Sequence, residues 1–336
     1  MDIKKDPQLF RELTEHDFPR TLVPFNECFF FEQIIETEEY DKEPRHDEPQ
    51  FLLRVMGLSR GQVIRRPSCK WPHVNATVDV FCEETNRVYL AHAPMLACQG
   101  LTDVGAEVYI SEMESWQKEN QPDYVQASEM CIYTSVYHEP EKKNEQIIGV
   151  WPPIAQEVVD SALEKNYFSL LKNTTSVRRD MRFTIEGKVD SQFDFTGYCD
   201  DGVPFIMQVQ NIPFADYEDV SIKERRSMDF RNRAANTKIA IYPDGARRYA
   251  TITDPELQAI KDLTTIKQES IIRCVLCNVI NRDDIDRYNP SRFDSVYRAL
   301  MRDAVKSGVV LINLIVKWDR EGYCYFIRDD VPTVRF

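Results

Sequence analysis

Glycine is scarce in this sequence, at 11 of 336 residues. This scarcity excludes collagen-like and glycine-rich low-complexity architectures. Neither GxxxxGK[ST] nor GxGxxG occurs, so nucleotide-binding loops of those two types are absent. No apolar run approaches the ~20 residues that cross a bilayer, and the opening MDIKKDPQLF lacks the apolar stretch of a secretory signal. We therefore expect a cytoplasmic or nuclear protein that does not enter membranes.

Cysteine is also sparse, and its number is odd. Nine cysteines are spread along the chain, which is more typical of reduced thiols than of a disulfide framework. Cys274 and Cys277 form a C-x-x-C inside the apolar run RCVLCNVI, where strand geometry sends residues three apart to opposite faces. Because no second Cys or His pair follows at ligand spacing, we expect core thiols here and no zinc site.

The chain lacks a surplus of positive charge. It has 42 Lys and Arg against 55 Asp and Glu, a net charge of −13, which excludes a protein that coats nucleic acid or an anionic membrane with its whole surface. Residues 1–50 hold six basic and fourteen acidic residues, a net charge of −8. Residues 220–250 hold eight basic and three acidic residues, a net charge of +5. Any site for a polyanion must therefore be local.

The sequence does have the apolar fraction of a packed globular protein, 43%, over a length greater than one usual core. We predict an acidic N-terminal extension over residues 1–50. Residues 51–150 carry β-branched and aromatic runs about ten residues apart, which predict a small β-barrel or sandwich. Residues 151–336 alternate strands with helices, which predicts an α/β domain with partly parallel strands. The fold class is thus α/β, or α+β over the whole chain.

Helical spacing of apolar residues is clearest in three places of the second domain. It begins at Ile154, it recurs after Asp254 as N-cap and Pro255 at the first helical position, and it extends from Ser295 to Ser307 before Gly308. These three helices separate the strand-like runs of residues 151–336.

Eight short blocks of the sequence resemble, in their order and spacing, the sugar fermentation stimulation protein (SfsA) family. The blocks are AHAPMLACQGL (91–101), IGVWPPIAQEVVDSAL (148–163), RRDMRF (178–183), SQFDF (191–195), FIMQVQNI (205–212), IAIYPDG (239–245), VLCNVINRDD (275–284) and RALMRDAVKSGVVLI (298–312). The resemblance runs from about residue 70 to the C-terminus. It implies an OB-like β-barrel followed by a PD-(D/E)XK nuclease-like α/β domain, in a family described as nucleic-acid-binding.

The resemblance also implies a site of defined chemistry. In a PD-(D/E)XK site, two acidic residues and the Glu of a Glu-x-Lys surround Mg²⁺, which lowers the pKa of a bound water that the Lys orients or deprotonates. The first acid corresponds to Asp180 and the second to Asp194, but the Glu-x-Lys corresponds to Gln208 and Gln210. A glutamine supplies neither the negative charge nor the ammonium. We therefore predict a degenerate, non-catalytic site that needs no cofactor.

Two polar turns of the family are also changed. The HCPNTG-like turn reads His92-Ala-Pro-Met-Leu-Ala, and a second Asn-Thr signature has become Trp151-Pro152. We expect His92 to be structural, because no second His lies at ligand spacing.

The basic region at 220–250 is the predicted nucleic-acid surface, for DNA or RNA. Phe230 would stack on bases, and the cations would contact phosphates. The cations are Arg225, Arg226, Arg231, Arg233, Lys238, Arg247 and Arg248. The simpler interpretation of the same region is a solvated insertion, or an anchor for the acidic N-terminal segment.

Two alternatives to a non-catalytic nucleic-acid-binding protein stay open. The first is a Mg²⁺-dependent nuclease with Asp180, Asp194 and Asp244 on the metal and a migrated lysine, Lys188 or Lys238. The second is a protein-interaction subunit of a larger assembly, which the net charge of −13 favours.

Overall fold

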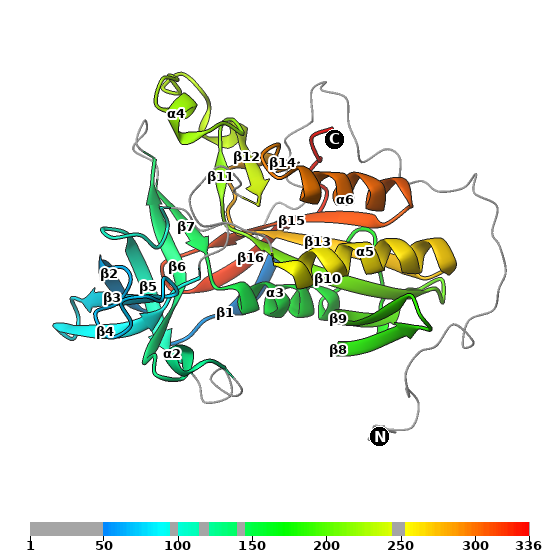
Figure 1. Cartoon of the computed structure of the whole chain (residues 1–336), viewed down its shortest axis with the longest axis horizontal. Helices are drawn as coiled ribbons and strands as arrows, with labels where there is room; N and C mark the ends of the chain where they lie inside the picture. Colours follow the sequence, from blue (N-terminus) through cyan, green and yellow to red (C-terminus); the bar gives the residue numbers. More distant parts are fainter. Residues whose placement is uncertain (1–49, 95–99, 114–120, 140–144, 244–252, 336) are drawn as a thin grey trace.

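Six strands form an antiparallel sheet that curls into a ring, here called the ring sheet. The computed structural model describes residues 50–94, 100–113, 121–139, 145–243 and 253–335 (Figure 1). The ring strands are β2 (Ser59–Arg65), β3 (Thr77–Cys82), β4 (Arg87–His92), β5 (Glu107–Glu112), β6 (Met130–His138) and β7 (Glu145–Gly149), with the short helix α2 (Asp123–Gln126) before β6. Their order is β4-β3-β2-β5-β6-β7, and an extra parallel pairing of β4 with β6 closes the ring. An antiparallel ring is thus present where the sequence predicted a barrel.

A second, seven-stranded sheet, here called the large sheet, runs through the rest of the molecule. Its strands are β1 (Gln50–Arg54), β8 (Thr175–Ile185), β9 (Val189–Tyr198), β10 (Pro204–Ile212), β13 (Arg273–Ile280), β15 (Val310–Trp318) and β16 (Tyr323–Arg328). The order is β1-β16-β15-β13-β10-β9-β8. The central pairs β10–β13 and β13–β15 are parallel and the outer pairs are antiparallel. The mixed α/β layer that the sequence predicted is therefore confirmed.

The large sheet is apolar on both faces. The helix α3 (Pro152–Glu164) packs in one core cluster with Cys277 and its neighbours at alternate positions of β13, while α5 (Asp254–Glu269) and α6 (Ser295–Lys306) pack in the other with Cys274. The two cysteines thus lie on opposite faces, fully buried, as their spacing predicted. Burial raises the pKa of the Cys274 thiol to about 12 and also raises that of Cys277. The described cysteines are all free thiols.

Capping residues determine where the helices begin and end. α6 covers Ser295–Lys306 within one residue of its predicted span, and Gly308, with φ +91°, ends it. The N-cap of α5 is Thr253, whose backbone N–H donates to the Glu256 side chain at 2.9 Å. The predicted N-cap, Asp254, is instead the first helical residue, because Thr253 and Glu256 complete a capping box. None of the helices in the described ranges combines the length and apolar character that span a bilayer.

The first described strand belongs to the large sheet. β1 pairs antiparallel with β16, with Phe51 opposite Tyr325. Local strand propensity alone predicts that residues from 51 onward belong to the barrel. Pairing partners are set by contacts with residues more than 250 positions away in the chain, which local patterns do not encode.

A third, small sheet connects the two larger ones. It contains β11 (Ala215–Asp216), β12 (Lys238–Tyr242) and β14 (Ile285–Pro290) in the order β11-β12-β14. Between β11 and β12 the chain forms the short helices α4 (Ile222–Arg225) and η4 (Ala235–Thr237), and Figure 1 shows α4 projecting beyond the small sheet.

Gly149 fixes the approach of the ring sheet to the large sheet. Its N–H donates to the Asn281 carbonyl at 3.3 Å, and the Trp318 indole N–H donates to the Asn281 side chain at 2.9 Å. A Cβ at position 149 would lie 2.5 Å from Asn281 Oδ1 and 2.6 Å from Trp318 Nε1. This contact therefore requires a residue without a side chain.

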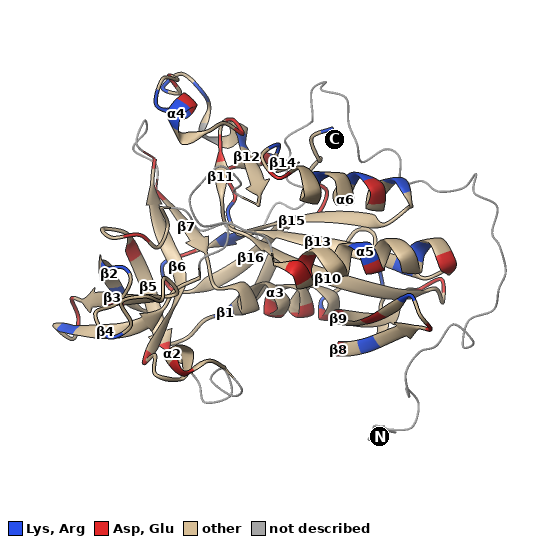
Figure 2. Cartoon of the chain, viewed as in Figure 1, with Lys and Arg blue, Asp and Glu red and all other residues tan. Residues whose placement is uncertain are grey.

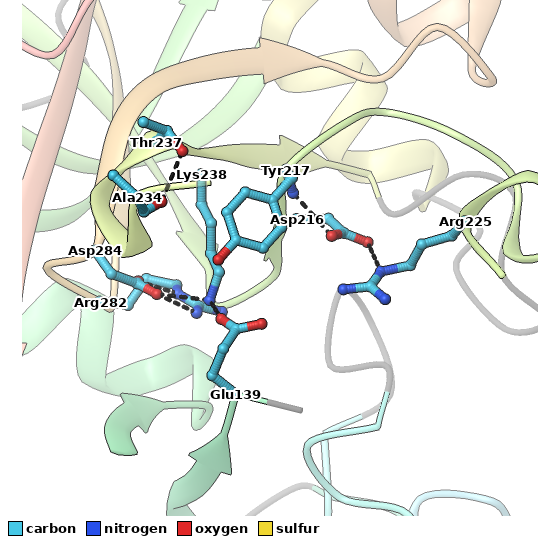
Figure 3. Close-up of polar contacts among 9 residues, drawn as sticks. All are labelled: Glu139, Asp216, Tyr217, Arg225, Ala234, Thr237, Lys238, Arg282 and Asp284. Atoms are coloured by element: carbon cyan, nitrogen blue, oxygen red, sulfur yellow. Dashed lines mark hydrogen bonds and ion pairs between the residues drawn. The ribbon is translucent and has the colours of Figure 1, made fainter. Parts of the chain in front are cut away.

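A buried cluster of charges joins all three sheets (Figure 3). Lys238, from β12, is 2% exposed and contacts Glu139, just after β6, as well as Asp284 at 3.0 Å. Arg282 binds the same Asp284 with two hydrogen bonds of 2.6 and 2.7 Å. The Lys238 ammonium also lies 4.9 Å from the centre of the Tyr137 ring. Two cations and two carboxylates thus compensate one another between the ring sheet and the rest of the chain.

The cluster keeps Asp284 ionised. Burial alone would raise the pKa of Asp284, but the charge and hydrogen bonds of Arg282, together with Lys238, lower it to about 2. Both carboxylates therefore depend on cations that water does not reach.

We predict that Lys238→Met destabilises the protein by about 3–5 kcal/mol. Glu139 would lose its buried cation, and Asp284 would lose one of its two cations. Urea unfolding of the full chain measures the change in the free energy of unfolding. The matched control is Lys223→Met, at an exposed lysine of α4, which should change stability by less than about 0.5 kcal/mol. Equal effects of the two substitutions would show that the cluster contributes no stability.

Candidate functional site

Asp194 lies where β9 and β10 separate. The pairing of these strands stops at Met207 opposite Phe195, one residue short of Asp194. The Asp194 carboxylate, 9% exposed, then accepts three hydrogen bonds: from the Gln208 side chain at 2.6 Å, from the Val209 backbone N–H at 2.6 Å and from the Gln156 side chain of α3 at 2.5 Å. Three uncharged N–H donors therefore surround this carboxylate.

The electrostatic setting of Asp194 is that of a desolvated acid. Burial is the main cause that raises its pKa, and the nearby charge of Asp180 adds to this. The hydrogen bonds from Val209 and Gln156 and the charge of Arg179 act in the opposite direction but do not cancel the effect of burial.

Asp180 lies across the β8–β9 pair from Asp194. The neighbouring residues pair as Arg179 with Phe195 and Met181 with Phe193, which places the two aspartates opposite each other. Asp180 is exposed and has a φ of +56°, in the left-handed region. The structure thus brings together Asp180, Asp194 and Gln208, as the resemblance implied.

Gln210 has different surroundings from Gln208. It is 5% exposed, and its Oε1 accepts a hydrogen bond of 2.8 Å from the Tyr297 hydroxyl of α6. The Tyr297 hydroxyl also contacts the Tyr288 hydroxyl at 2.8 Å. The position that the resemblance assigned to a lysine is therefore part of a buried hydrogen-bond network and not a side chain beside Asp194.

Neither candidate for a migrated lysine contacts Asp194. Lys188 lies in the turn between β8 and β9, where its ammonium pairs with Glu269 of α5 at 2.7 Å. Lys238 lies in the buried cluster with Glu139 and Asp284.

The donor set around Asp194 does not fit Mg²⁺. This ion prefers several carboxylate and water oxygens in octahedral geometry, whereas here the one buried carboxylate already accepts three N–H hydrogen bonds. Within the described ranges, no group of three or more His, Cys, Asp or Glu side chains is placed to hold a metal ion. Asp244, the third predicted metal ligand, lies outside the described residues.

Most of the described cations of the predicted nucleic-acid surface are paired with acids. Arg225 pairs with the buried Asp216 at 2.6 Å, Arg231 with Asp229 at 2.7 Å, and Arg233 with Glu218 at 2.7 Å. Figure 2 shows the basic and acidic residues interspersed on α4 and along α5 and α6. The basic count of this region therefore overstates its positive field.

Two residues of that surface are inside the protein. Lys238 is 2% exposed, so its predicted contact with phosphate does not agree with the structure. Phe230 is 1% exposed and stacks on Tyr217 with 4.9 Å between ring centres, so it is not available to bases. Arg226 is exposed and has no ion-pair partner among the residues that the structure describes, whereas Arg247 and Arg248 lie outside them.

His92 is a packed histidine at the end of β4. Its ring meets the Trp151 ring edge-on at 5.3 Å and stacks at 6.2 Å on Tyr124. Burial, and to a smaller extent the charge of Arg66, lowers its pKa to about 4. This agrees with the structural role that we expected.

Gln156 and the Val209 N–H are the parts of the site that sequence reasoning missed. Gln156 lies in the first turns of α3, among the apolar residues that pack this helix on the sheet. An uncharged side chain on an amphipathic helix carries no sequence signal for a distant carboxylate, and a backbone N–H carries none at all. Only the strand separation at Asp194 makes both donors available.

We predict that stability falls as pH decreases from about 6.5 to about 4 through His92. The unfolded chain binds a proton there near pH 6.5 whereas the folded chain does so near 4, so the folded state loses at most ~3 kcal/mol over this window. His92→Phe removes this part of the pH dependence in urea unfolding. His73→Gln, at an exposed histidine, should leave it unchanged, and an unaltered slope in His92→Phe would contradict the assignment.

We predict that Asp194→Ala destabilises the protein by about 1–3 kcal/mol, because the Val209 N–H and two amides lose their acceptor. Asp180→Asn is the control, since Asp180 is exposed and asparagine tolerates its positive φ. Thermal or urea unfolding compares the two. The role of Asp194 as a hydrogen-bond acceptor would be refuted by a loss in Asp180→Asn as large as in Asp194→Ala.

Comparison with known proteins agrees with this architecture. No protein-family model and no curated protein sequence matches the chain. Among solved structures, the chain is similar to SfsA from Pyrococcus furiosus, solved in complex with Ca²⁺, with a TM-score of 0.61 and 14% identity over 85% of this chain and 100% of that one. YjeQ from Thermotoga maritima matches with a TM-score of 0.16 and 12% identity over 83% of this chain and 75% of that one, which does not indicate a shared fold. The described part of this chain therefore has the SfsA-like fold that the sequence resemblance predicted.

Proposed function

We propose that this chain is a non-catalytic, nucleic-acid-binding protein built on an SfsA-like fold. In this proposal the ring sheet corresponds to an OB-like barrel, and the large sheet with α3, α5 and α6 corresponds to a PD-(D/E)XK nuclease-like domain. The observation that carries it is the hydrogen bonding of Asp194 by Gln156, Gln208 and Val209.

The reason is chemical. A metal-dependent nuclease needs carboxylates whose lone pairs face a divalent cation, which then stabilises charge that develops on the phosphate. At Asp194 those lone pairs face N–H groups, and the one acid opposite, Asp180, is exposed on β8. The Pyrococcus furiosus protein holds Ca²⁺ in its structure, but for this chain we propose no divalent cation at Asp194.

The proton-handling amine is the second missing group. Gln210 is buried against Tyr297, Lys188 pairs with Glu269, and Lys238 is held between Glu139 and Asp284. None of these contacts leaves an ammonium beside Asp194. Loss of the metal ligand and of the amine removes stabilisation that a nuclease realises mainly in the transition state.

A second candidate is a protein-interaction subunit. The observation that favours it is the pairing of Arg225, Arg231 and Arg233 with acids. A surface of paired charges attracts a polyanion weakly but provides hydrogen-bond partners for another protein.

We predict no cleavage when the full chain is incubated with single- and double-stranded DNA and RNA in Mg²⁺ or Mn²⁺, because no described group holds the metal or moves the proton. Gel analysis of labelled substrates measures this. Cleavage that disappears in Asp194→Ala would establish the nuclease alternative, with Asp180, Asp194 and Asp244 as its ligands. An oligonucleotide should nevertheless bind at about 50 mM salt and bind more weakly at about 200 mM.

Divalent cations provide the control for this experiment. Mn²⁺ should leave the melting temperature of the natural chain unchanged, since a ligand stabilises only the state that binds it. Gln208→Glu places a second carboxylate beside Asp194 and should produce a Mn²⁺-dependent rise. A rise in the natural chain would refute the degenerate site. Absence of oligonucleotide binding at low salt would favour the protein-interaction candidate.

A further inference from the structure

We propose that three aromatic rings on β1 and β16 form a stacking platform for the bases of a single-stranded nucleic acid. The aromatic platform consists of Phe51, Tyr323 and Tyr325. This inference rests on the proposed nucleic-acid binding, but it places the contact at residues that belong neither to the Asp194 site nor to the basic region at 220–250.

The strand pairing puts the three rings together. Phe51 of β1 lies opposite Tyr325 of β16, and Tyr323 lies two residues before Tyr325, on the same side of the strand. The Phe51 ring is 6.0 Å from the Tyr323 ring and 6.4 Å from the Tyr325 ring, measured between centres, in edge-on arrangements. The two tyrosine rings lie 6.3 Å apart and 23° from parallel.

The platform faces outward, whereas the alternate residues of the same strands face the core. Leu52, Cys324 and Phe326 are 2%, 0% and 4% exposed and belong to the core cluster that includes α3. Phe51, by contrast, is 44% exposed, and Tyr323 and Tyr325 are partly exposed. A contiguous set of exposed rings on a sheet surface marks an interaction site more often than scattered single residues do.

Two cations adjoin the rings. The Arg54 guanidinium lies 4.4 Å from the centre of the Tyr323 ring, and the Lys165 ammonium lies 4.5 Å from that of Phe51. Arg54 donates to the Glu321 carbonyl at 3.2 Å and Lys165 to the Phe51 carbonyl at 3.0 Å. These partners are neutral, so neither cation has a carboxylate partner among the residues that the structure describes.

Acids are also present at the border of the platform. Asp319 accepts hydrogen bonds from the Tyr323 backbone N–H at 2.9 Å and from the Tyr325 hydroxyl at 3.5 Å. Asp283 pairs with Lys317 at 2.8 Å. Asp319 and the neighbouring Glu321 therefore place negative charge at the Tyr325 end of the platform, whereas Arg54 and Lys165 place positive charge at Tyr323 and Phe51, where a phosphate would bind.

A single-stranded nucleic acid fits this combination best. Its unpaired bases offer flat faces for the rings and its phosphates offer anions for the cations. A duplex buries its base faces, and an acidic peptide would use the cations but not the rings. In the basic region at 220–250, by contrast, the aromatic ring is buried and three arginines are paired with acids.

The test is a titration of the full chain with fluorescein-labelled oligothymidylate of about 12 nucleotides, followed by anisotropy. The Phe51→Ala/Tyr323→Ala double variant should bind about tenfold or more weakly, because each base stacked on an aromatic ring contributes measurably to affinity. Phe51→Trp and Tyr323→Phe keep a ring and should bind as the natural chain does. Phe293→Ala is the matched control, since Phe293 is 41% exposed with Arg292 over its ring at 4.9 Å but stands outside the platform.

The outcomes separate this inference from the proposed function. If the natural chain binds and the double variant binds equally well, the platform is wrong and nucleic-acid binding stands. If the natural chain does not bind at about 50 mM salt, both fail. Equal affinity for duplex DNA or for a polyglutamate peptide would also overturn the platform. Where the alanine variant melts at a lower temperature than the natural chain, Tyr323→Leu repeats the test with an apolar side chain that lacks a ring, and weaker binding supports the platform.

Discussion

The structure depends on one buried ammonium. Lys238 connects the small sheet to Glu139 at the end of β6 and to Asp284 after β13, so the same charge holds elements of all three sheets. Arg282 completes the compensation by donating two hydrogen bonds to Asp284. A buried ion pair is not a strong source of stability compared with apolar packing, but removal of one partner leaves an isolated charge. The position of β12 therefore depends on keeping all four charged groups together.

The Asp194 carboxylate is compensated in a different way. Burial disfavours its ionised form, and uncharged N–H donors, together with the charge of the nearby Arg179, oppose that effect. Uncharged donors from α3 and β10 can satisfy a carboxylate that would otherwise need a metal ion, and they bring no charge that a reaction could use. The same hydrogen bonds attach α3 to the point where β9 and β10 separate, so this buried carboxylate contributes to packing.

Sequence reasoning correctly predicted the features that local patterns determine, and it missed the features that tertiary contacts determine. The spacing of Cys274 and Cys277 predicted opposite faces, and helical periodicity placed α6 within one residue, because strand and helix periods are properties of the backbone. The proximity of Asp194 and Gln208 followed from the family resemblance. The interior position of Lys238 could not be predicted, because a lysine in a basic stretch is expected to be exposed. Its partners Asp284 and Glu139 are about 46 and 99 residues away in the sequence, and only the fold brings them into contact with it.

The distribution of charge constrains how this protein can bind a polyanion. A chain with a net charge of −13 repels one at long range, and the arginines nearest α4 are occupied by acids. At the aromatic platform two cations form no ion pair within the described part of the chain, so counterion release there involves about two phosphates and gives a shallow salt dependence. Stacking must then supply most of the affinity. Stacking requires exposed base faces. The low positive charge that excludes a protein coating duplex nucleic acid therefore favours the binding of a single-stranded nucleic acid.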